Sequence, residues 1–469
     1  MIPLTLAEVA QATGGTLSDC PDPSVRVTGP VVYDSRQVEP GSLFTAVVGE
    51  RVDGHDFAAR AVTEGGAVGV LATRPVGVPA VIVTDVLEAL AALAHEVTSR
   101  LTATTVVGLT GSVGKTSTKD LLAQVLGRHG GTVYTEGSFN NELGFPITAL
   151  KVRQDTDFLV LEMGARGKGH IASLCAITPP RVGLVLNVGS AHVGEFGSRE
   201  GTAQAKGELV ESLPESGTAV LNADDPLVRG MAARTKAKVL YFGESEQADV
   251  RAADVVLDAS GRPSFTLVTP AGSAPVALQL YGEHHVSNAL AAAAVALACG
   301  MDTEAIASAL SGAGSLSKWR MEVTDRPDGV TVINDAYNAS PESMRAALRA
   351  LVAIAGRGPE ARRTWAVLGE MRELGHESVA EHDALGRFVV RLNISTLVAV
   401  GGTDAAVMEL GARNEGSWGE ESVQVPDADT AIELLRQQVR PGDVVLVKAS
   451  RSVGLERVAQ ALLADGAAE

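Results

Sequence analysis

Hydrophobic and polar positions follow three different patterns along the chain. Up to about Arg100 the apolar runs are short: VTGPVVYDSR and GSLFTAVVG predict strands, and residues 53–64 and 86–101 predict helices. We expect a small mixed α/β domain here, with a mere extension of the following domain as the alternative.

From Thr104 the pattern becomes strand, glycine-rich turn and helix, repeated. TTVVGLT precedes GSVGKTS and a helix over residues 118–126, and further apolar runs of strand length are GTVYT, FLVLEMG, VGLVLNVG and TAVLNAD. Near-continuous apolar strands that alternate with helices are typical of a parallel sheet covered on both faces. Ligands of such sheets bind beyond the carboxyl ends of the strands. We therefore expect the polar residues that follow these strands to form a site.

The last third of the chain repeats this alternation. It follows an expected hairpin over residues 264–280, an Ala-rich helix from Val286 and a Gly/Ser-rich linker, SGAGSLSKWR. Strands are predicted in GVTVINDAYN, RTWAVLGEM, TLVAVGG and DVVLVKASR, and helices over 341–355 and 452–464. The sequence thus predicts an α/β protein of three domains: 1–102 (small, mixed α/β), 103–314 (central, parallel sheet) and 315–469 (Rossmann-like).

Composition and charge exclude several classes of function. The 469 residues suggest roughly three domains. With 56 acidic against 39 basic residues, no Lys/Arg-rich run and 4% aromatic residues, nucleic acid is not an expected partner. Three widely spaced cysteines without a CxxC pair indicate a reducing compartment. The start lacks the basic region of a signal peptide, and the most apolar helix is about half the length that spans a bilayer. We expect a cytoplasmic protein without membrane insertion.

The strongest chemical signal is the string Gly111-Ser112-Val113-Gly114-Lys115-Thr116-Ser117 between a strand and a helix. Glycines let successive backbone N–H groups face phosphate oxygens, and the helix N-terminus adds its dipole. Lys115 would reach the terminal phosphates, and the Thr116 hydroxyl would bind Mg²⁺. The spacing GxxGKT is shorter than the common GxxxxGK[ST], so the strand-before, helix-after context carries this prediction of a P-loop ATPase domain.

Three further polar residues are candidates, each with an ordinary alternative. Glu162 ends the strand FLVLEMG and could hold Mg²⁺, or be a common strand-end carboxylate. His192 follows the strand VGLVLNVG, where a lone histidine is more often structural. Lys206 lies in AQAKGELV, which alone reads as a solvated helix lysine. No GxSxG elbow, HExxH, paired cysteines or NKxD is present. If ATP activates a carboxylate, however, no protein nucleophile is required.

Eight segments in one order carry a resemblance over essentially the whole chain. They are TGSVGKTSTKD, FNNELGFP, LEMGARGKGHI, NVGSAHVGEFGS, AKGEL, LNADDP, HHVSNALAAAA and NDAYNASPESM. Their succession closely resembles the Mur ligases of peptidoglycan synthesis. The N-terminal YDSR and GSLFTAVVGERVDGHDF and the C-terminal VLGEMRELGHES and LVKASRS are similar to the member whose substrates are UDP-N-acetylmuramoyl-tripeptide and D-alanyl-D-alanine.

The resemblance implies a monomeric, ATP-dependent amide-bond ligase of cytoplasmic peptidoglycan precursor synthesis. Its domains would bind the UDP-substrate (1–102), hydrolyse ATP (103–314) and complete ligation in a mobile Rossmann-like domain (315–469). The tripeptide carboxylate would attack the γ-phosphate to give an acyl phosphate, and the amine of D-alanyl-D-alanine would then attack the acyl carbon. Because water destroys acyl phosphates, the C-terminal domain should close before chemistry.

The resemblance also implies roles for individual residues. Lys115, Lys206 and His192 would be catalytic. Two Mg²⁺ ions would be supported by Thr116, Glu162, His192 and Lys206, and Lys206 matches the lysine that becomes a carbamate in several relatives. The remaining nucleotide contacts would be Asn288, Arg320 and Asp335. The substrate contacts would be Ser35, Arg36, Asn140, Asn141, Lys448, Ser450 and Arg451.

One departure and several alternatives remain at this point. Many relatives have HNxxNA, whereas this chain has His284-His285-Val286-Ser287-Asn288-Ala289, which puts one adenine-side hydrogen bond in question. The preceding ligase, which adds the diamino acid, has a DNPR motif that this sequence lacks. Folylpolyglutamate synthase shares the core but needs no uridine domain. A P-loop switch predicts hydrolysis without an amine acceptor, and a non-catalytic module would not need Lys115, Glu162 and His192 together.

Overall fold

The N-terminal part is a small mixed α/β unit in the computed structural model, which describes residues 1–469 except 50, 190–196, 357, 418 and 467–469. Five described strands form a sheet in the order β2-β7-β6-β5-β4, and β1 pairs with β3. The strands are β1 Leu4–Thr5, β2 Thr16–Ser18, β3 Arg26–Val27, β4 Val31–Val32, β5 Leu43–Thr45, β6 Gly69–Ala72 and β7 Ala80–Ile82. The helices are α1 Leu6–Thr13, α2 Ala58–Thr63 and α3 Val86–Ser99.

The central unit is built on a sheet with nine described strands in the order β16-β15-β14-β13-β12-β11-β8-β10-β9. All pairs from β9 to β14 are parallel, and the hairpin β15–β16 is antiparallel. The strands are β8 Thr105–Thr110, β9 Thr132–Tyr134, β10 Phe158–Glu162, β11 Val182–Val185, β12 Thr218–Asn222, β13 Lys238–Gly243, β14 Val250–Leu257, β15 Pro263–Thr269 and β16 Gly272–Ala277.

Helices cover both faces of this sheet, as its apolar strands require. Along β10, Leu159 and Leu161 enter one core and Phe158 and Val160 the other, because successive side chains of a strand point to opposite faces. One face carries α5 Gly144–Ala149, α6 His170–Ile177, α8 Arg199–Glu211 and α9 Pro226–Arg229. The other face carries α4 Lys115–Leu126, α10 His284–Ala298 and α11 Thr303–Ser311.

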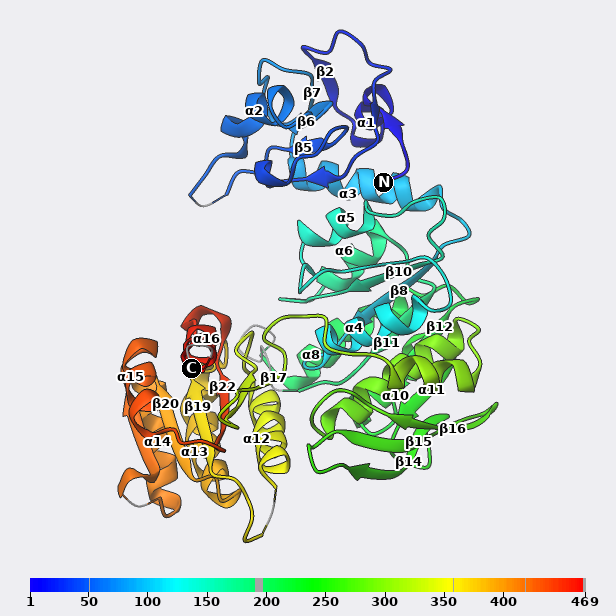
Figure 1. Ribbon diagram of the computed structural model, residues 1–469. Helices are drawn as coiled ribbons and strands as arrows, with labels where there is room; N and C mark the ends of the chain where they lie inside the picture. The colour runs from blue at the N-terminus through cyan, green and yellow to red at the C-terminus, as the bar shows by residue number, and fades with distance from the viewer. Residues whose placement is uncertain (50, 190–196, 357, 418, 467–469) are drawn as a thin grey trace.

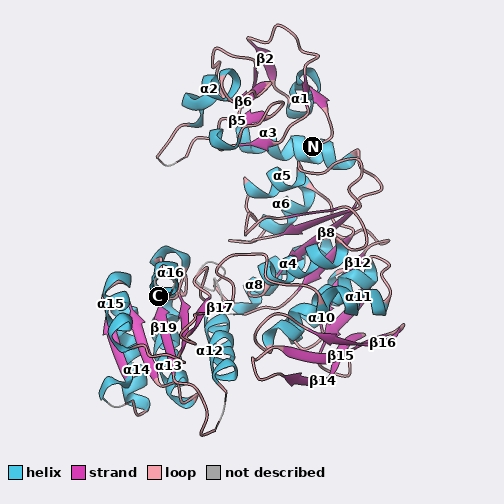
Figure 2. Ribbon diagram, viewed as in Figure 1, coloured by secondary structure: helices cyan, strands magenta, loops and turns pink. Residues whose placement is uncertain are grey.

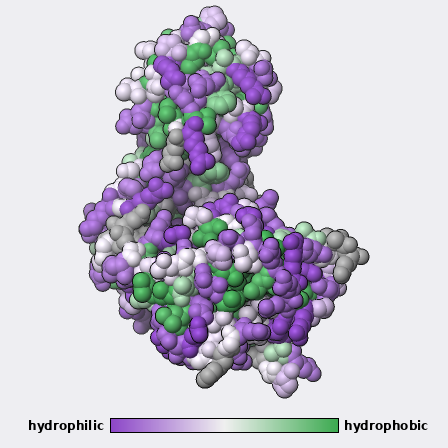
Figure 3. All heavy atoms as spheres, turned by 90° about the vertical axis from the view of Figure 1, so that its left-hand side faces the viewer, coloured by the Kyte–Doolittle hydropathy of each residue, from purple (hydrophilic) through white to green (hydrophobic). Residues whose placement is uncertain are grey.

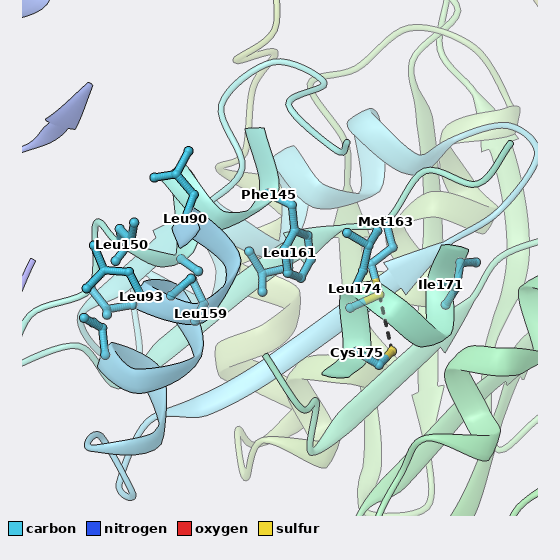
Figure 4. Close-up of a cluster of buried hydrophobic side chains, with 14 of the residues drawn as sticks. Leu90, Leu93, Phe145, Leu150, Leu159, Leu161, Met163, Ile171, Leu174 and Cys175 are labelled. Carbon is cyan, nitrogen blue, oxygen red and sulfur yellow. Dashed lines mark hydrogen bonds between the residues drawn. The ribbon is translucent and has the colours of Figure 1, made fainter. Parts of the chain in front are cut away.

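Helix α3 joins the N-terminal and central units through a common core. Its apolar side chains Leu90 and Leu93 are fully buried and belong to the same cluster as Phe145, Leu159 and Leu161 of the central unit. Figure 4 shows Leu90 and Leu93 in the same cluster of buried side chains as Phe145, Leu159 and Leu161. In Figure 3 the N-terminal lobe stands on the larger lower body at a constriction.

The C-terminal unit is a separate three-layer α/β sandwich, with its strands between two helix layers (Figure 2). Its sheet has six described strands in the order β17-β18-β22-β19-β20-β21, all parallel except β17. They are β17 Glu322–Asp325, β18 Thr331–Asn334, β19 Thr364–Gly369, β20 Thr396–Val400, β21 Ser422–Val425 and β22 Val444–Lys448. One face carries α12 Pro341–Ala355, α13 Ser378–Arg391 and α14 Thr403–Glu415, the other α15 Ala428–Gln438 and α16 Glu456–Asp465.

The predicted fold class is confirmed, whereas some element limits are wrong. The P-loop helix begins at Lys115 rather than at residue 118, so the loop runs directly into its first turn. Residues 53–64 divide into a 3₁₀ turn, Gly54–Phe57, and α2, because the Asp53 carboxylate accepts from the His55 N–H and tightens the start. The last helix begins at Glu456 after a short 3₁₀ turn, Arg451–Val453. The domain limits remain predictions. Among the described residues no helix has the length and hydropathy to cross a bilayer.

Candidate functional site

A cavity of about 360 Å³ lies where the central unit faces the C-terminal unit. The central unit contributes the phosphate loop and the start of α4 (112–117), residues 138, 140–142, 164–166 and 170, Glu162 and Lys206. The C-terminal side contributes Arg320, residues 337–340, Ser343 and the segment 372–374. The cavity therefore joins the carboxyl edge of the central sheet to the C-terminal unit, where ligands of parallel sheets bind.

The phosphate loop has the geometry that an anion needs. It connects β8 to α4, and the first-turn amides of α4 have no intrahelical acceptors, so they are available to phosphate oxygens. Gly114 has φ +82°, and a Cβ there would lie 2.6 Å from the Asn288 Oδ1 atom. Both observations require glycine at this position.

Asn187, which sequence reasoning missed as a site residue, fixes the start of this loop. Its Oδ1 accepts from the backbone N–H groups of Ser112 and Val113 at 3.0 and 2.9 Å, and its Nδ2 donates to the Val113 carbonyl at 3.1 Å. Asn187 follows β11, the strand next to β8, which was a signal available in the sequence. The phosphate loop is thus shaped before any ligand arrives.

Thr116 and Glu162 offer oxygen atoms as possible metal ligands, and Asn140 holds the Glu162 carboxylate in place. The Thr116 hydroxyl donates to the Glu162 carboxylate at 3.1 Å, and Asn140 donates to the other carboxylate oxygen at 2.7 Å. Ser138, which was not predicted, lies 3.1 Å from the same hydroxyl. Glu162 is 1% exposed, so its charge needs a cation.

This donor set fits Mg²⁺. Mg²⁺ is commonly held by one or two carboxylates together with substrate phosphates and water, rather than by a full protein cage. Thr116 and Glu162 supply hard oxygen atoms beside the phosphate loop. Across the described part of the chain no group of three His, Cys, Asp or Glu side chains is assembled for a metal. His192, the predicted third metal residue, lies outside the described residues.

Two lysines enter the same cavity with altered protonation. Burial lowers the pKa of Lys206 well below its ordinary value, and the nearby Lys115 ammonium lowers this pKa further. Lys206 is 4% exposed and makes no hydrogen bond or ion pair with any residue that the structure describes. Burial also lowers the pKa of Lys115, whose Nζ donates to the Gly111 carbonyl at 2.7 Å. The surroundings of Lys206 therefore favour its neutral amine form.

Arg320 and Asn288, predicted to contact the nucleotide, both adjoin the phosphate loop. The Arg320 guanidinium donates to the Thr116 hydroxyl at 3.3 Å and stacks on the Tyr337 ring at 4.2 Å. Its Nε is buried without a hydrogen-bond partner among the described residues. Asn288 Oδ1 accepts from the Thr118 hydroxyl at 3.3 Å.

His285, the departure from the expected motif, is buried beside Asn288. Burial lowers its pKa well below the ordinary value, and the adjacent His284 ring lowers it further, so the ring is neutral. Burial also lowers the pKa of His284, to about 4. His285 Nδ1 lies 3.4 Å from the Asn288 amide nitrogen, and its Nε2 has no described hydrogen-bond partner.

Lys448, predicted to border the amine substrate, is buried in an ion pair with Asp335. The two groups lie 2.7 Å apart, and the Lys448 ammonium also donates to the Asn338 carbonyl at 2.8 Å. Burial lowers the pKa of Lys448, although the Asp335 carboxylate opposes this shift. The other Asp335 oxygen accepts from the Met321 N–H at 3.1 Å. Neither side chain lines the cavity, and the ion pair joins Lys448 to Asp335, which the sequence predicted as a nucleotide contact.

The other predicted substrate residues are spread over the molecule. Ser450 accepts from the Arg372 N–H at 2.9 Å, and Arg451 stacks on Trp319 and pairs with Glu456. Asn141 lines the cavity and accepts from the Gly144 N–H at 2.9 Å. Ser35 and Arg36 lie in the N-terminal unit, in a 3₁₀ turn (Ser35–Gln37) away from the cavity, where Arg36 pairs with Asp34 (Figure 1).

The linker between the central and C-terminal units runs over α4. Gln124 donates to the Gly314 carbonyl at 2.9 Å and accepts from the Gly314 N–H at 3.0 Å, and Asp120 accepts from the Ser317 N–H at 3.1 Å. Beyond Ser317, Trp319 and Met321 have left-handed φ angles of +60° and +48°. The chain is thus held by the central unit up to Ser317 and turns sharply where it enters the C-terminal unit.

Comparison with known proteins covers nearly the whole chain. The model of the Mur ligase middle domain matches residues 109–296, that of the Mur ligase glutamate ligase domain matches 319–451, and that of the Mur ligase family catalytic domain matches 30–98. A UDP-N-acetylmuramoyl-tripeptide--D-alanyl-D-alanine ligase of Mycobacterium tuberculosis is 51% identical over 99% of this chain and 98% of its own length.

Two solved structures are similar over the full length. A MurF crystal structure from Acinetobacter baumannii has a TM-score of 0.87 and 33% identity, and covers 98% of this chain and 99% of its own. The MurF ligase from Thermotoga maritima in complex with ADP has a TM-score of 0.80 and 31% identity, over 94% and 99% of the two chains.

Proposed function

The chain belongs to the Mur ligase family, and we propose from that premise that it is the ligase that adds D-alanyl-D-alanine to UDP-N-acetylmuramoyl-tripeptide. It is an ATP-dependent, amide-bond-forming enzyme of peptidoglycan synthesis. The observation that carries the proposal is a single cavity that brings Lys115, Thr116, Glu162 and Lys206 opposite residues of the C-terminal unit.

The residues suggest a division of labour in the first step. The α4 amides and Lys115 bind the ATP phosphates, and Arg320 adds a cation beside Thr116. The terminal carboxylate of the tripeptide attacks the γ-phosphate, a C–O–P linkage forms, and the bond to ADP breaks. Phosphoryl transfer of this kind needs positioning and charge neutralisation rather than a protein nucleophile.

The second step forms the amide. The amine of D-alanyl-D-alanine attacks the acyl carbon, the C–N bond forms, and the C–O bond to phosphate breaks as a tetrahedral intermediate collapses. The ammonium group gives up one proton to solvent or a nearby base before it attacks. The nitrogen loses a second proton, to the departing phosphate, as the intermediate collapses, and the amide keeps one hydrogen. The walls from the C-terminal unit exclude water from the acyl phosphate when they close.

Two Mg²⁺ ions are part of this proposal. When bound it would neutralise phosphate charge, and Thr116 and Glu162 would hold it, with His192 and Lys206 as further expected contributors. Lys206 supports a carbamate because a neutral buried amine can capture CO₂ and gain a carboxylate head. A mass loss of the bound CO₂ on acidification, and rescue of Lys206→Ala by short carboxylates, are the expected results; neither would occur with an unmodified lysine.

The N-terminal unit is the proposed receptor for the uridine nucleotide, with Ser35 and Arg36 as contacts. Lys448, Ser450 and Arg451 remain proposed only as the framework of the amine site, since each side chain already binds another protein group. A cytoplasmic location and a monomeric state are also proposed, the first because ATP is supplied there. Sedimentation equilibrium at micromolar concentration would test the second.

The test is phosphate release with UDP-N-acetylmuramoyl-tripeptide and Mg-ATP while the amine is varied. D-alanyl-D-alanine should stimulate release, and single amino acids should not. Lys115→Ala should abolish stimulation and leave the circular dichroism spectrum unchanged. Equal stimulation by a single diamino acid with the dipeptide precursor would support the preceding ligase instead, and amine-independent release would support a P-loop switch.

A further inference from the structure

Two polar side chains on one face of α4 bind the backbone of the linker. Asp120 and Gln124 are four residues apart, and residues at this spacing share a face of a helix. Gln124 exchanges two hydrogen bonds with the Gly314 backbone, at 2.9 and 3.0 Å, and Asp120 accepts from the Ser317 N–H at 3.1 Å. The linker therefore runs antiparallel to α4, toward the start of the helix. We call Asp120 and Gln124 the linker clamp.

The same helix face ends at the phosphate loop, where the linker brings a cation. Thr116 lies four residues before Asp120, in the first turn of α4, and its hydroxyl accepts from the Arg320 guanidinium at 3.3 Å. The Arg320 Nε is buried without a hydrogen-bond partner among the described residues. The contacts keep one spacing, 314 with 124, 317 with 120 and 320 with 116. The register of the linker on α4 thus determines which linker residue lies at the phosphate loop.

Between this part of the linker and α4 lies a second cavity rather than close packing. Its volume is about 360 Å³, and it is bordered by linker residues 316–320 and by Thr116, Lys119 and Asp120 of α4. Leu316, the aliphatic residue of this stretch, is 46% exposed. A chain segment that borders a cavity lacks the van der Waals contacts that close packing provides. Hydrogen bonds from the linker clamp therefore hold the linker where apolar packing is weak.

A buried ion pair holds the Asp120 carboxylate in place. The Lys119 Nζ lies 2.6 Å from Asp120 Oδ1, and the two residues are 1% and 6% exposed. The same ammonium lies 5.5 Å from the centre of the Tyr134 ring. Asp120 accepts from the linker with its other oxygen, Oδ2. The ion pair thus keeps this acceptor directed at the Ser317 N–H.

Shortly after Ser317 the chain is bound to the C-terminal unit. The Trp319 N–H donates to the Glu322 carboxylate at 3.2 Å, and the Trp319 carbonyl accepts from the Tyr337 N–H at 3.2 Å. From residue 317 to residue 319 the free stretch is two residue steps long. If Ser317 were released, the stretch would begin at Gly314 and be five steps long. The linker clamp therefore sets how much free chain precedes Arg320.

We infer that Asp120, supported by Gln124, is a positioning residue for Arg320: it holds the linker in the register that keeps the guanidinium at the phosphate site. The inference rests on the proposed function and adds a residue that acts on ATP binding through Arg320. The entropic cost of bringing the ends of a free stretch together grows with the logarithm of its length. Five steps in place of two should therefore weaken the hold on the nucleotide about 4-fold.

The first experiment compares two substitutions of Asp120 that differ in one acceptor. Both variants also carry Lys119→Met, so that no buried ammonium is left without its partner. Asp120→Asn keeps an oxygen for the Ser317 N–H, whereas Asp120→Leu has a similar size and no acceptor. The dissociation constant for a non-hydrolysable ATP analogue with Mg²⁺, measured by titration calorimetry, should be about 4-fold higher with Asp120→Leu. The KM for D-alanyl-D-alanine should agree within about twofold between the two variants.

The second experiment lengthens the linker and leaves α4 unchanged. Three glycines inserted between Ser317 and Lys318 extend the free stretch from two steps to five, the length expected with Asp120→Leu. The dissociation constant for the ATP analogue should rise by the same factor, about 4-fold. Because the buried ion pair is intact, this variant gives a result even if Asp120→Leu does not fold. The same insertion between Pro270 and Ala271, in an exposed hairpin turn, should leave the constant unchanged.

The third experiment asks whether Asp120 acts through Arg320. In an Arg320→Gln background the Asp120→Asn and Asp120→Leu variants should bind the analogue with constants within about twofold of each other, because no guanidinium remains to be positioned. Hydrogen exchange read by mass spectrometry should still show a faster Ser317 amide with Asp120→Leu. A role in stability alone would give the same difference in affinity in both backgrounds, and that result would overturn the inference.

The outcomes separate this inference from the function beneath it. If the wild type forms no amide with D-alanyl-D-alanine, the proposed function fails, whatever the affinities are. If the amide forms but Asp120→Asn and Asp120→Leu bind the ATP analogue equally well, the positioning role alone is overturned. An unchanged affinity after insertion of the glycines beside Ser317 would overturn it too, because the length of the free stretch would then have no effect.

Discussion

At the scale of single residues, the site is a set of charges whose neighbours decide their roles. Lys115 and Lys206 share one cavity, and burial favours their neutral forms, Lys206 most strongly. Lys448, by contrast, faces a carboxylate that favours its charged form and opposes the effect of burial. Three lysines of the same chemistry therefore differ in the protonation state that their surroundings favour.

Lys448→Ala should damage nucleotide binding more than amine binding. Removing the ammonium leaves Asp335 buried without its charge partner, which costs about 3–5 kcal/mol in measured cases, and the carboxylate would shift from its place. We expect the KM for ATP to rise about 10-fold or more and the KM for D-alanyl-D-alanine to change far less. Steady-state kinetics would check this, with Lys236→Ala, an exposed lysine, as the control. If only the KM for D-alanyl-D-alanine rose, Lys448 would instead be assigned to the amine-binding pocket.

Lys206→Met should raise the thermal midpoint of the CO₂-free protein, and more so at pH 7 than at pH 9. The folded-state pKa of Lys206 lies below its unfolded value near 10.4, so the unfolded chain binds the extra proton, and this favours unfolding increasingly as pH falls below that value. Methionine has no titrating group, so Lys206→Met removes this pH-dependent destabilisation of the folded state. For units of this size each kcal/mol corresponds to about 2–4 °C. A gain that grows with pH would contradict the assignment of a neutral lysine.

At the scale of elements, the strand–loop–helix unit β8–α4 is the part that the sequence predicted best. The apolar strand, the glycines and the helix are neighbours in the chain, so local patterns were sufficient to place Lys115 and Thr116. The carboxyl-edge rule also brought Glu162 correctly to Thr116, since β10 is the parallel neighbour of β8.

Contacts between distant segments could not be predicted from the sequence, for a physical reason. Asn187 caps the phosphate loop from 74 residues away, and Lys448 reaches Asp335 over 113 residues. Such pairs depend on strand order and on the packing of separate units, which residue patterns do not encode. Arg372 and Glu373 were visible in the sequence only as part of VLGEMRELGHES, whose place opposite the phosphate loop depends on how the units are joined.

Gly114→Ala should weaken ATP binding through the shape of the loop. Its φ of +82° is strained for alanine, and the new Cβ would meet Asn288 Oδ1 at 2.6 Å. We expect a loss of about 1–2 kcal/mol of stability and a KM for ATP about 10-fold higher. Gly230→Ala is the matched control, because its φ is not left-handed and a Cβ there meets no atom within 4 Å. Equal effects of both substitutions would show that the loop geometry is not the cause.

At the scale of the whole molecule, the cavity is shared between units that are joined by one linker. The central unit supplies the phosphate loop and metal donors, and the C-terminal unit supplies Asn338 to Ser340 and the 372–374 segment. The linker is held to α4 as far as Ser317, and its left-handed residues follow immediately, so we expect a rotation of the C-terminal unit to be concentrated at residues 318–321. Hinges of this kind usually consist of a few such positions.

Closure should be visible as contraction of the protein in solution. A single compact domain of this length would have a radius of gyration of about 23 Å, and the three-lobed chain should exceed this value without ligands. Small-angle X-ray scattering should show a decrease when a non-hydrolysable ATP analogue, Mg²⁺ and the tripeptide precursor are added together. Addition of the tripeptide precursor alone serves as the control. An unchanged radius with all three ligands would indicate that the cavity is already closed.

The helix α3, whose leucines lie in the core of the central unit, has a consequence for heat denaturation. Leu90 and Leu93 lie in a hydrophobic core that the N-terminal and central lobes have in common, so neither of these lobes can unfold and leave the other intact. The C-terminal lobe has separate cores. A calorimeter should accordingly record two endotherms rather than three. ATP should move both, since its pocket has walls on either side of the divide.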